Sequence, residues 1–109
     1  MTEVAAYTPN VAVVTGAAQG IGKTIALRLA DDGFDLALAD LATQQDKLDG
    51  LVNEILSKGR KAISVQTDVT KEQDVMFLIE RTVHELGGVD VVSNSASSRF
   101  GRRLIAMRI

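Results

Sequence analysis

The segment 15–22, Thr-Gly-Ala-Ala-Gln-Gly-Ile-Gly, is the part of the chain whose residue types and spacing could bind phosphate. The three glycines of this segment can each be explained by one requirement of a phosphate-binding turn. One allows a tight turn out of a strand, one lets the backbone approach a pyrophosphate, and one lets a helix pack close to a sheet. Free N–H groups at the start of that helix would then face the phosphates. Alone, such a loop can be no more than a flexible turn, so its meaning depends on the elements around it.

The elements on either side of this segment favour the binding interpretation. The apolar runs 11–15 and 35–40 predict buried strands of a parallel sheet, because they lack the alternation of a half-exposed strand. Between them, Ile21, Ile25 and Leu29 recur at helical spacing and predict a helix. The glycine-rich segment therefore follows a predicted strand and opens a predicted helix, as a phosphate-binding loop requires.

The rest of the chain continues the alternation of strands and helices. We expect a helix over 48–58, a strand over 61–66, a helix from a capping box at Thr70 and Gln73 to residue 86, and a strand over 89–92. This order, β-α-β-α-β-α-β, predicts an α/β fold with a Rossmann-type, doubly wound parallel sheet, truncated to four strands in the order 3-2-1-4. Ligands of such sheets bind in the crevice at the carboxyl ends of strands 1 and 4.

Three motifs resemble those of the short-chain dehydrogenase/reductase family. The segment 15–22 matches every fixed position of the family's nucleotide-binding motif, Thr-Gly-x-x-x-Gly-x-Gly. Asp68-Val69 follows the third strand, and residues 89–96 are similar to the family's fourth strand and its Asn-Asn-Ala-Gly motif, with Asn94 and Ala96 kept. The resemblance covers residues 10–96, and the segment 16–41 is most similar to acetoin and diacetyl reductases.

This resemblance implies the NAD-binding N-terminal part of an oxidoreductase that acts on secondary alcohols and ketones. It also implies roles for ten residues along the cofactor. They are Gly16, Gln19, Gly20, Ile21 and Gly22 at the pyrophosphate, Asp40 at the ribose, Asp68 and Val69 at the adenine, and Asn94 and Ala96 at the end of the fourth strand.

Asp40 closes the second strand and bears on the choice of cofactor. A carboxylate there can accept hydrogen bonds from the adenine ribose hydroxyls and would repel a 2′-phosphate, which favours NAD over NADP. Ala17 and Ala18 agree with this preference, because no basic residue of the loop could pair with that phosphate. The alternative is that Asp40 merely leads into the next turn.

No residue of the 109 can be assigned a catalytic role. Members of the family use a tyrosine, a lysine four positions later, a serine and an upstream asparagine, whereas the one tyrosine here, Tyr7, is followed at the fourth position by Val11. His84 is the single histidine and there is no cysteine, so we expect a solvated side chain and no metal site. The acids Asp31, Asp32 and Asp35 are expected to form a solvated corner. Whether the chain is an enzyme thus stays open.

Charge divides the chain at residue 97. Residues 1–97 carry 8 basic and 14 acidic side chains, whereas residues 98–109 carry four arginines and no acid, within a total of −2. We therefore expect a Rossmann half-domain over 1–97 and a basic tail over 98–109 unrelated to the family. Three explanations of the tail are open: a truncation artefact, a short form whose tail binds an acidic partner or membrane surface, and an amphipathic segment that covers part of the exposed sheet.

The function expected from these features is that of a cofactor-binding part, inactive alone, in a cytoplasmic protein without nucleic-acid or membrane partners. No apolar run approaches the length of a membrane span and no signal peptide is evident. The alternative is a non-catalytic nucleotide-binding or interaction protein that pairs with a full-length homologous subunit. A free edge on the fourth strand would favour such pairing, or aggregation and weak NAD binding.

Overall fold

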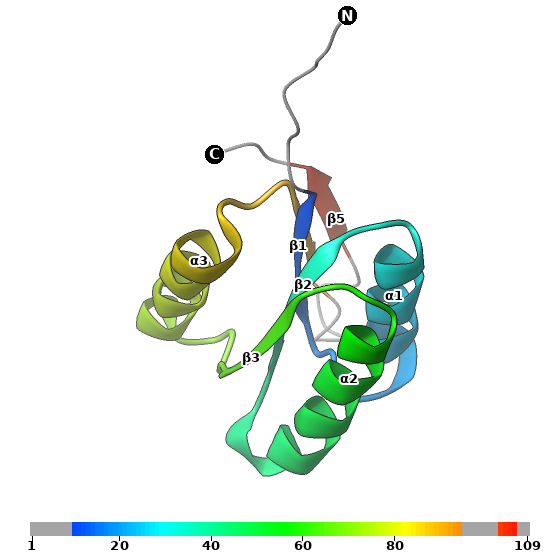
Figure 1. Ribbon diagram of the computed structural model, residues 1–109. Coiled ribbons are helices and arrows are strands. Elements are labelled where there is room, and N and C mark those ends of the chain that lie inside the picture. The colour runs from blue at the N-terminus through cyan, green and yellow to red at the C-terminus, as the bar shows by residue number, and fades with distance from the viewer. Residues whose placement is uncertain (1–9, 95–102, 107–109) are drawn as a thin grey trace, which may run out of the picture.

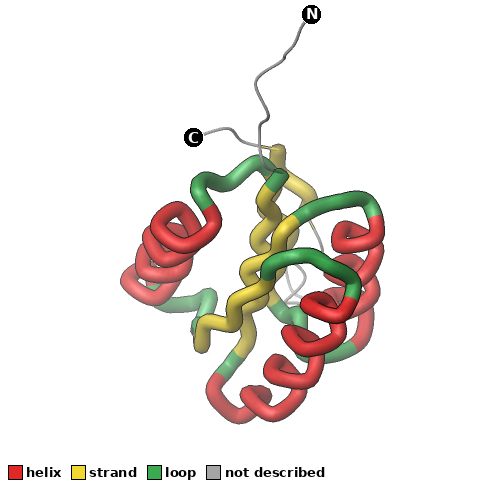
Figure 2. Tube along the Cα trace, in the orientation of Figure 1, coloured by secondary structure: helices red, strands yellow, loops and turns green. Residues whose placement is uncertain are grey.

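The computed structural model describes residues 10–94 and 103–106 and shows one sheet with helices on both faces (Figures 1 and 2). The strands are β1 (Val11–Thr15), β2 (Asp35–Asp40), β3 (Ala62–Gln66), β4 (Val91–Asn94) and β5 (Arg103–Ala106). The helices are α1 (Gly20–Asp31), a 3-10 turn η1 (Ala42–Gln44), α2 (Gln45–Ser57) and α3 (Glu72–Leu86). In the described part of the chain, no helix is long and apolar enough to cross a membrane.

The order of the strands confirms the predicted topology. The sheet runs β3-β2-β1-β4-β5, and β1 to β4 are parallel to one another. Thr15 at the end of β1 lies in register with Ala39 of β2 and Asn94 of β4. The carboxyl ends of the central strands therefore meet at one edge, and the order of the strands reverses between β1 and β4.

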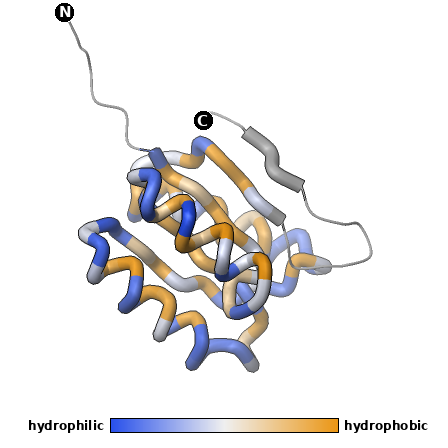
Figure 3. Tube along the Cα trace, turned by 90° about the vertical axis from the view of Figure 1, so that its right-hand side faces the viewer, coloured by the Kyte–Doolittle hydropathy of each residue, from blue (hydrophilic) through white to orange (hydrophobic). Residues whose placement is uncertain are grey.

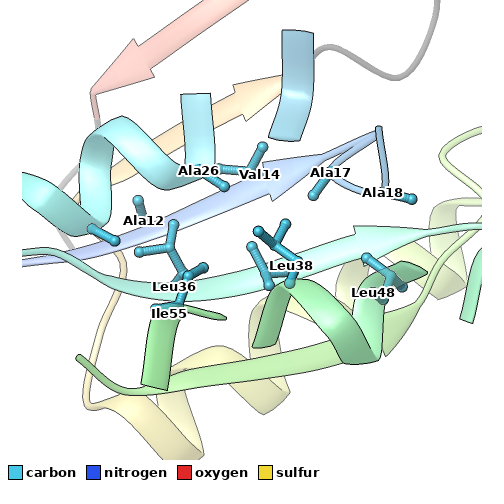
Figure 4. Packing of buried hydrophobic residues seen from close by; sticks show 11 residues of the cluster. Ala12, Val14, Ala17, Ala18, Ala26, Leu36, Leu38, Leu48 and Ile55 are labelled. Atoms are coloured by element: carbon cyan, nitrogen blue, oxygen red, sulfur yellow. The ribbon is translucent and has the colours of Figure 1, made fainter. Parts of the chain in front are cut away.

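The apolar strands are buried on both faces, which explains why they lack alternation. Figure 1 shows α1 and α2 on one side of the sheet and α3 on the other. Toward α1 and α2 lie Ala12, Val14, Leu36 and Leu38 (Figure 4), and the cluster that includes residues of α3 contains Val11, Val13, Ala37 and Ala39. Along the helices polar and apolar residues alternate, whereas the central strands between them are mainly apolar (Figure 3).

Helix α1 packs against the sheet through small residues. Its buried residues are Gly22, Ala26 and Ala30, while the side chain of Ile21 is 47% exposed. Small side chains at this spacing let the helix axis lie close to the sheet, so that the larger Ile25 and Leu29 pack only partly against the core. The helix is thus present where the spacing predicts it, and the exposed Ile21 lies at its first turn.

Two local predictions near the third helix and fourth strand also need correction. No capping box forms at Thr70, whose hydroxyl donates to Asp68 Oδ1 at 2.6 Å, and α3 begins after Lys71. Strand β4 starts two residues later than expected, because Asp90 binds Val11 through its backbone N–H and also through its side-chain carboxylate. The Asp90 N–H donates to the Val11 carbonyl at 2.8 Å, and the Val11 N–H donates to Asp90 Oδ2 at 2.9 Å.

Asp35 is not part of a solvated corner. Its side chain is buried, and its Oδ1 accepts a hydrogen bond from the Lys61 N–H at 3.0 Å and lies 3.6 Å from Arg60 Nε. Asp31 and Asp32 are exposed, as expected. The difference arises because Asp35 is the first residue of an internal strand. Its carboxylate can therefore accept a hydrogen bond from the N–H of Lys61, the residue just before the neighbouring strand β3.

The edge of β4 is paired, which overturns the expectation of a free edge. Residues 103–106 lie antiparallel to β4, with Val91 opposite Ala106 and Asn94 opposite Arg103. An antiparallel neighbour needs only a short connection, whereas a further parallel strand would need a crossover of a dozen residues or more. Of the three explanations for the tail, this pairing agrees best with a segment that covers part of the sheet.

We expect a chain ended at residue 97 to be less stable than the full chain and to self-associate. The four residue pairs between β4 and β5 alternate between hydrogen-bonded and non-bonded pairs, which gives about four ladder bonds. Each bond has a net worth of about 1 kcal/mol, so loss of β5 should lower the free energy of unfolding by about 4 kcal/mol and expose the edge of β4. Urea unfolding and sedimentation velocity measure these effects, with a chain ended at residue 106 as control. A 1–97 chain that is as stable and monomeric as the control would contradict the assigned role of β5.

Candidate functional site

The turn between β1 and α1 is held by backbone contacts to β2 and leaves its outer surface open. The Ala17 N–H donates to the Ala39 carbonyl at 3.1 Å, and the side chains of Ala17 and Ala18 are buried in the core, where Figure 4 shows them at the end of β1. Gly16 and Gly20 have φ of +67° and +62°. These left-handed conformations favour glycine, so the sequence of the loop matches its geometry.

The first turn of α1 presents backbone N–H groups without a side-chain cap among the described residues. Gln19 is the N-cap residue, in an extended conformation, and the first turn holds no acid. A Cβ added to Gly20 would meet no atom within 4 Å in the described structure. This combination of unpaired donors, a positive helix end and open space suits a phosphate group.

Asp40 connects the loop to the ends of two strands. Its Oδ2 accepts a hydrogen bond from the Ala18 N–H at 3.1 Å and its Oδ1 accepts one from the Leu41 N–H at 2.8 Å. The Thr67 N–H donates to the Asp40 carbonyl oxygen at 2.8 Å. Asp40 therefore does more than lead into a turn. Its carboxylate is half-buried, and each oxygen has lone pairs left to accept bonds from hydroxyl groups.

Asp68 and Val69 follow the end of β3 and are half-buried. The Asp68 N–H donates to Asp74 Oδ2 at 2.9 Å, which ties the loop to the first turn of α3. Asp68 Oδ1 accepts hydrogen bonds from the Thr70 hydroxyl at 2.6 Å and from the Thr70 N–H at 2.9 Å. The Thr70 hydroxyl, then the Thr70 N–H, hold the pKa of the Asp68 carboxyl below its usual value.

The Thr70→Val variant should raise the pKa of Asp68 toward its ordinary value. Because the folded pKa lies below the unfolded one, the bonded carboxylate stabilises the fold above the unfolded value of about 4 and loses that contribution as the pH falls through the folded pKa. Titration of the side-chain carboxyl ¹³C signal by NMR measures the change, with Thr43→Val in η1 as control. An unchanged Asp68 titration in Thr70→Val would contradict this hydrogen-bond arrangement.

The remaining predicted residues fall partly within the described chain. The backbone of Asn94 pairs in register with Thr15, whose hydroxyl donates to the Ser93 carbonyl at 3.4 Å. Ala96 lies outside the described residues. The structure thus brings the loop, Asp40, Asp68 and the backbone of Asn94 to the carboxyl edge of the four parallel strands. His84 is exposed on α3, away from this edge.

Lys47 is a residue of this region that the sequence reasoning missed. Its Nζ donates to Gln19 Oε1 at 2.6 Å, which joins the first turn of α2 to the glycine-rich loop. A cavity of about 530 Å³ lies between the two helices, lined by Ala18, Gln19, Gly20, Lys23, Lys47, Gly50, Leu51 and Glu54. The two bonded residues are 28 positions apart, so spacing within one motif gave no signal of their contact.

Comparison with known proteins decides the family. The family model described as short chain dehydrogenase matches residues 10–106. The chain belongs to the short-chain dehydrogenase/reductase family. It is 51% identical over 89 residues to the short-chain dehydrogenase/reductase eriH of Hericium erinaceus, which covers 80% of this chain and 35% of that protein. The chain therefore spans about a third of that relative's length.

Two solved structures show the same fold. A blue fluorescent protein from a metagenomic library, in complex with NADPH, is 39% identical with a TM-score of 0.74, covering 76% of this chain and 34% of that one. A short-chain dehydrogenase/reductase from Burkholderia phymatum, in complex with NAD, is 32% identical with a TM-score of 0.72, covering 77% and 29%. These two similar structures thus contain NADPH and NAD, respectively.

Proposed function

We propose that this chain binds NAD at the carboxyl edge of its sheet, as the cofactor-binding part of an oxidoreductase that acts on secondary alcohols and ketones. The observation that carries the proposal is the loop between β1 and α1. Gly20 combines a left-handed backbone with open space at the start of an uncapped helix, among the described residues. Glycine at this point lets the backbone approach a pyrophosphate, while the helix end supplies N–H donors.

The preference for NAD rests on Asp40. Its carboxylate is anchored by the N–H groups of Ala18 and Leu41, so it has a fixed position beside the loop. A fixed carboxylate can accept hydrogen bonds from the two ribose hydroxyls, and a 2′-phosphate brought to the same place would be repelled by like charge. We therefore propose that NAD binds more tightly than NADP.

When bound, the nicotinamide of NAD would accept or donate a hydride. The role of this chain would be to hold the cofactor. The 109 residues contain no tyrosine followed by lysine at the fourth position. We therefore expect them to bind NAD without oxidising secondary alcohols on their own. Asp68 and Val69 are proposed to lie at the adenine, and Asn94 and Ala96 along the cofactor.

Isothermal titration of the chain with NAD tests the proposal, with GTP, whose triphosphate carries more negative charge than the pyrophosphate of NAD, as a second nucleotide. We expect saturable binding of NAD at one site and at least about tenfold weaker binding of GTP. A tenfold ratio of dissociation constants corresponds to about 1.4 kcal/mol of binding free energy. Equal affinities would indicate an unspecific phosphate site. Absence of NAD binding by a folded chain would overturn the proposed function.

The second candidate function is that of a non-catalytic, nucleotide-binding protein that pairs with a longer homologous subunit. Helix α3 favours it, because Met76, Phe77 and Val83 are 55%, 51% and 37% exposed. Exposed apolar groups on a covering helix are typical of surfaces that pack against another chain or segment. Co-purification with a full-length relative expressed in the same cells would support this function, and separate elution of the two chains would reject it.

A further inference from the structure

Lys47 brings a positive charge to the glycine-rich loop from a separate helix. Its Nζ donates to Gln19 Oε1 at 2.6 Å, and the side chains of both residues are exposed. An ammonium group has three donors, of which this bond uses one. The remaining donors stay available to an anion beside the loop.

The cavity around this contact has an excess of positive charge. Lys23 and Lys47 line it together with one carboxylate, that of Glu54. Ala18, which also lines the cavity, donates its N–H to Asp40 Oδ2 at 3.1 Å. The cavity therefore adjoins the carboxylate that is proposed to hold the ribose hydroxyls.

We propose that Lys47 is a specificity-determining residue, which would receive the 2′-phosphate of an adenine dinucleotide and so limit the preference for NAD. This inference rests on the proposed function. A phosphate monoester carries close to two negative charges at neutral pH, and lysine binds phosphate as a point charge. Asp40 repels this group while Lys47 attracts it, so the two side chains set the ratio of the two affinities.

Gln19 has a defined part in this arrangement. An unrestrained lysine side chain loses rotamer freedom when it pairs with an anion. The bond from Lys47 Nζ to Gln19 Oε1 already restricts the ammonium group next to the loop. The sequence expectation that the loop has no cation to pair with a 2′-phosphate considered only residues within the loop, whereas this cation comes from α2.

The test compares dissociation constants for NAD and NADP in the full chain and in Lys47→Gln. Loss of an exposed charge pair should weaken the binding of NADP about fivefold and change the affinity for NAD by no more than about twofold. The same substitution is also made in an Asp40→Asn background, where NADP binds more tightly and a fivefold change is measurable. Lys58→Gln is the matched control, because Lys58 is a hydrogen-bonded lysine at the opposite end of the same helix, 2.8 Å from Asp31 Oδ1.

Each outcome separates the inference from the proposed function. A selective loss of NADP affinity in Lys47→Gln, in either background, supports the inference. Equal weakening of NAD and NADP would show that Lys47 only supports the loop, and no change in either would show that the phosphate lies elsewhere. Both results overturn the inference and leave NAD binding in place. Failure of the parent chain to bind NAD overturns the proposed function and the inference with it.

Discussion

Replacing Gly20 with alanine should weaken NAD binding by on the order of a hundredfold while the chain still folds. Gly20 has a φ of +62°, a region in which a residue with a Cβ is disfavoured by roughly 1–2 kcal/mol. Its added Cβ would meet no protein atom within 4 Å, so it would occupy the space through which a pyrophosphate approaches the helix end. The loss of affinity therefore exceeds what backbone strain alone would cause.

Gly59 provides a matched control for this variant. It has a φ of +84°, follows the C-cap residue Lys58 of α2, and also has no atom within 4 Å of an added Cβ. Gly59→Ala should lower the free energy of unfolding about as much as Gly20→Ala, by roughly 1–2 kcal/mol, and leave NAD affinity unchanged. Titration calorimetry and urea unfolding measure both quantities. Equal NAD affinities in the two variants would contradict the phosphate role of the loop.

The Asp40→Asn variant should shift the cofactor preference by about a hundredfold in the ratio of dissociation constants. A hydrogen bond to a charged group is worth about 1.5–3 kcal/mol and one to a neutral group about 1, so NAD should bind about tenfold more weakly. Removal of the negative charge should let NADP bind about tenfold more tightly. Asparagine keeps the shape of the side chain, and its carbonyl oxygen can still accept one of the two bonds from Ala18 and Leu41.

Asp46→Asn is the control for a change of charge in the same region. Asp46 is an exposed acid in the first turn of α2, so its substitution also removes one negative charge near the loop. We expect both affinities to stay within about twofold, because exposed charges contribute little at a distance. If Asp46→Asn shifted the ratio as much as Asp40→Asn, the preference would follow from overall charge and not from the anchored carboxylate.

The features predictable from the sequence were those encoded by short-range patterns. The apolar runs 11–15 and 35–40 gave two internal strands, and the glycine spacing in 15–22 gave the loop and the start of a helix. Asp40, Asp68 and Asn94 were placed correctly at the ends of their strands, because the order of elements fixes which loops share an edge of the sheet.

The features that were missed depend on contacts between distant segments. Lys47 reaches Gln19 across 28 positions, and Asp35 is buried because its carboxylate accepts the N–H of Lys61. The strand at 103–106 falls within the predicted basic tail, although its sequence contains the apolar residues Leu104 and Ile105. Two apolar residues among four arginines are too weak a local pattern to predict a strand, and this strand depends on its pairing with β4.

The most direct test of the central claim is a titration of ¹⁵N-labelled chain with NAD, followed by amide chemical shifts. We predict that the largest saturable changes fall on Gly16, residues 19–22 and Leu41, with smaller changes at Asp68, while amides at the opposite end of the sheet, such as Gly33 and Gly59, stay unchanged. Changes centred elsewhere in the chain, or none up to millimolar NAD in a folded sample, would contradict the assignment of this edge of the sheet as a nicotinamide dinucleotide site.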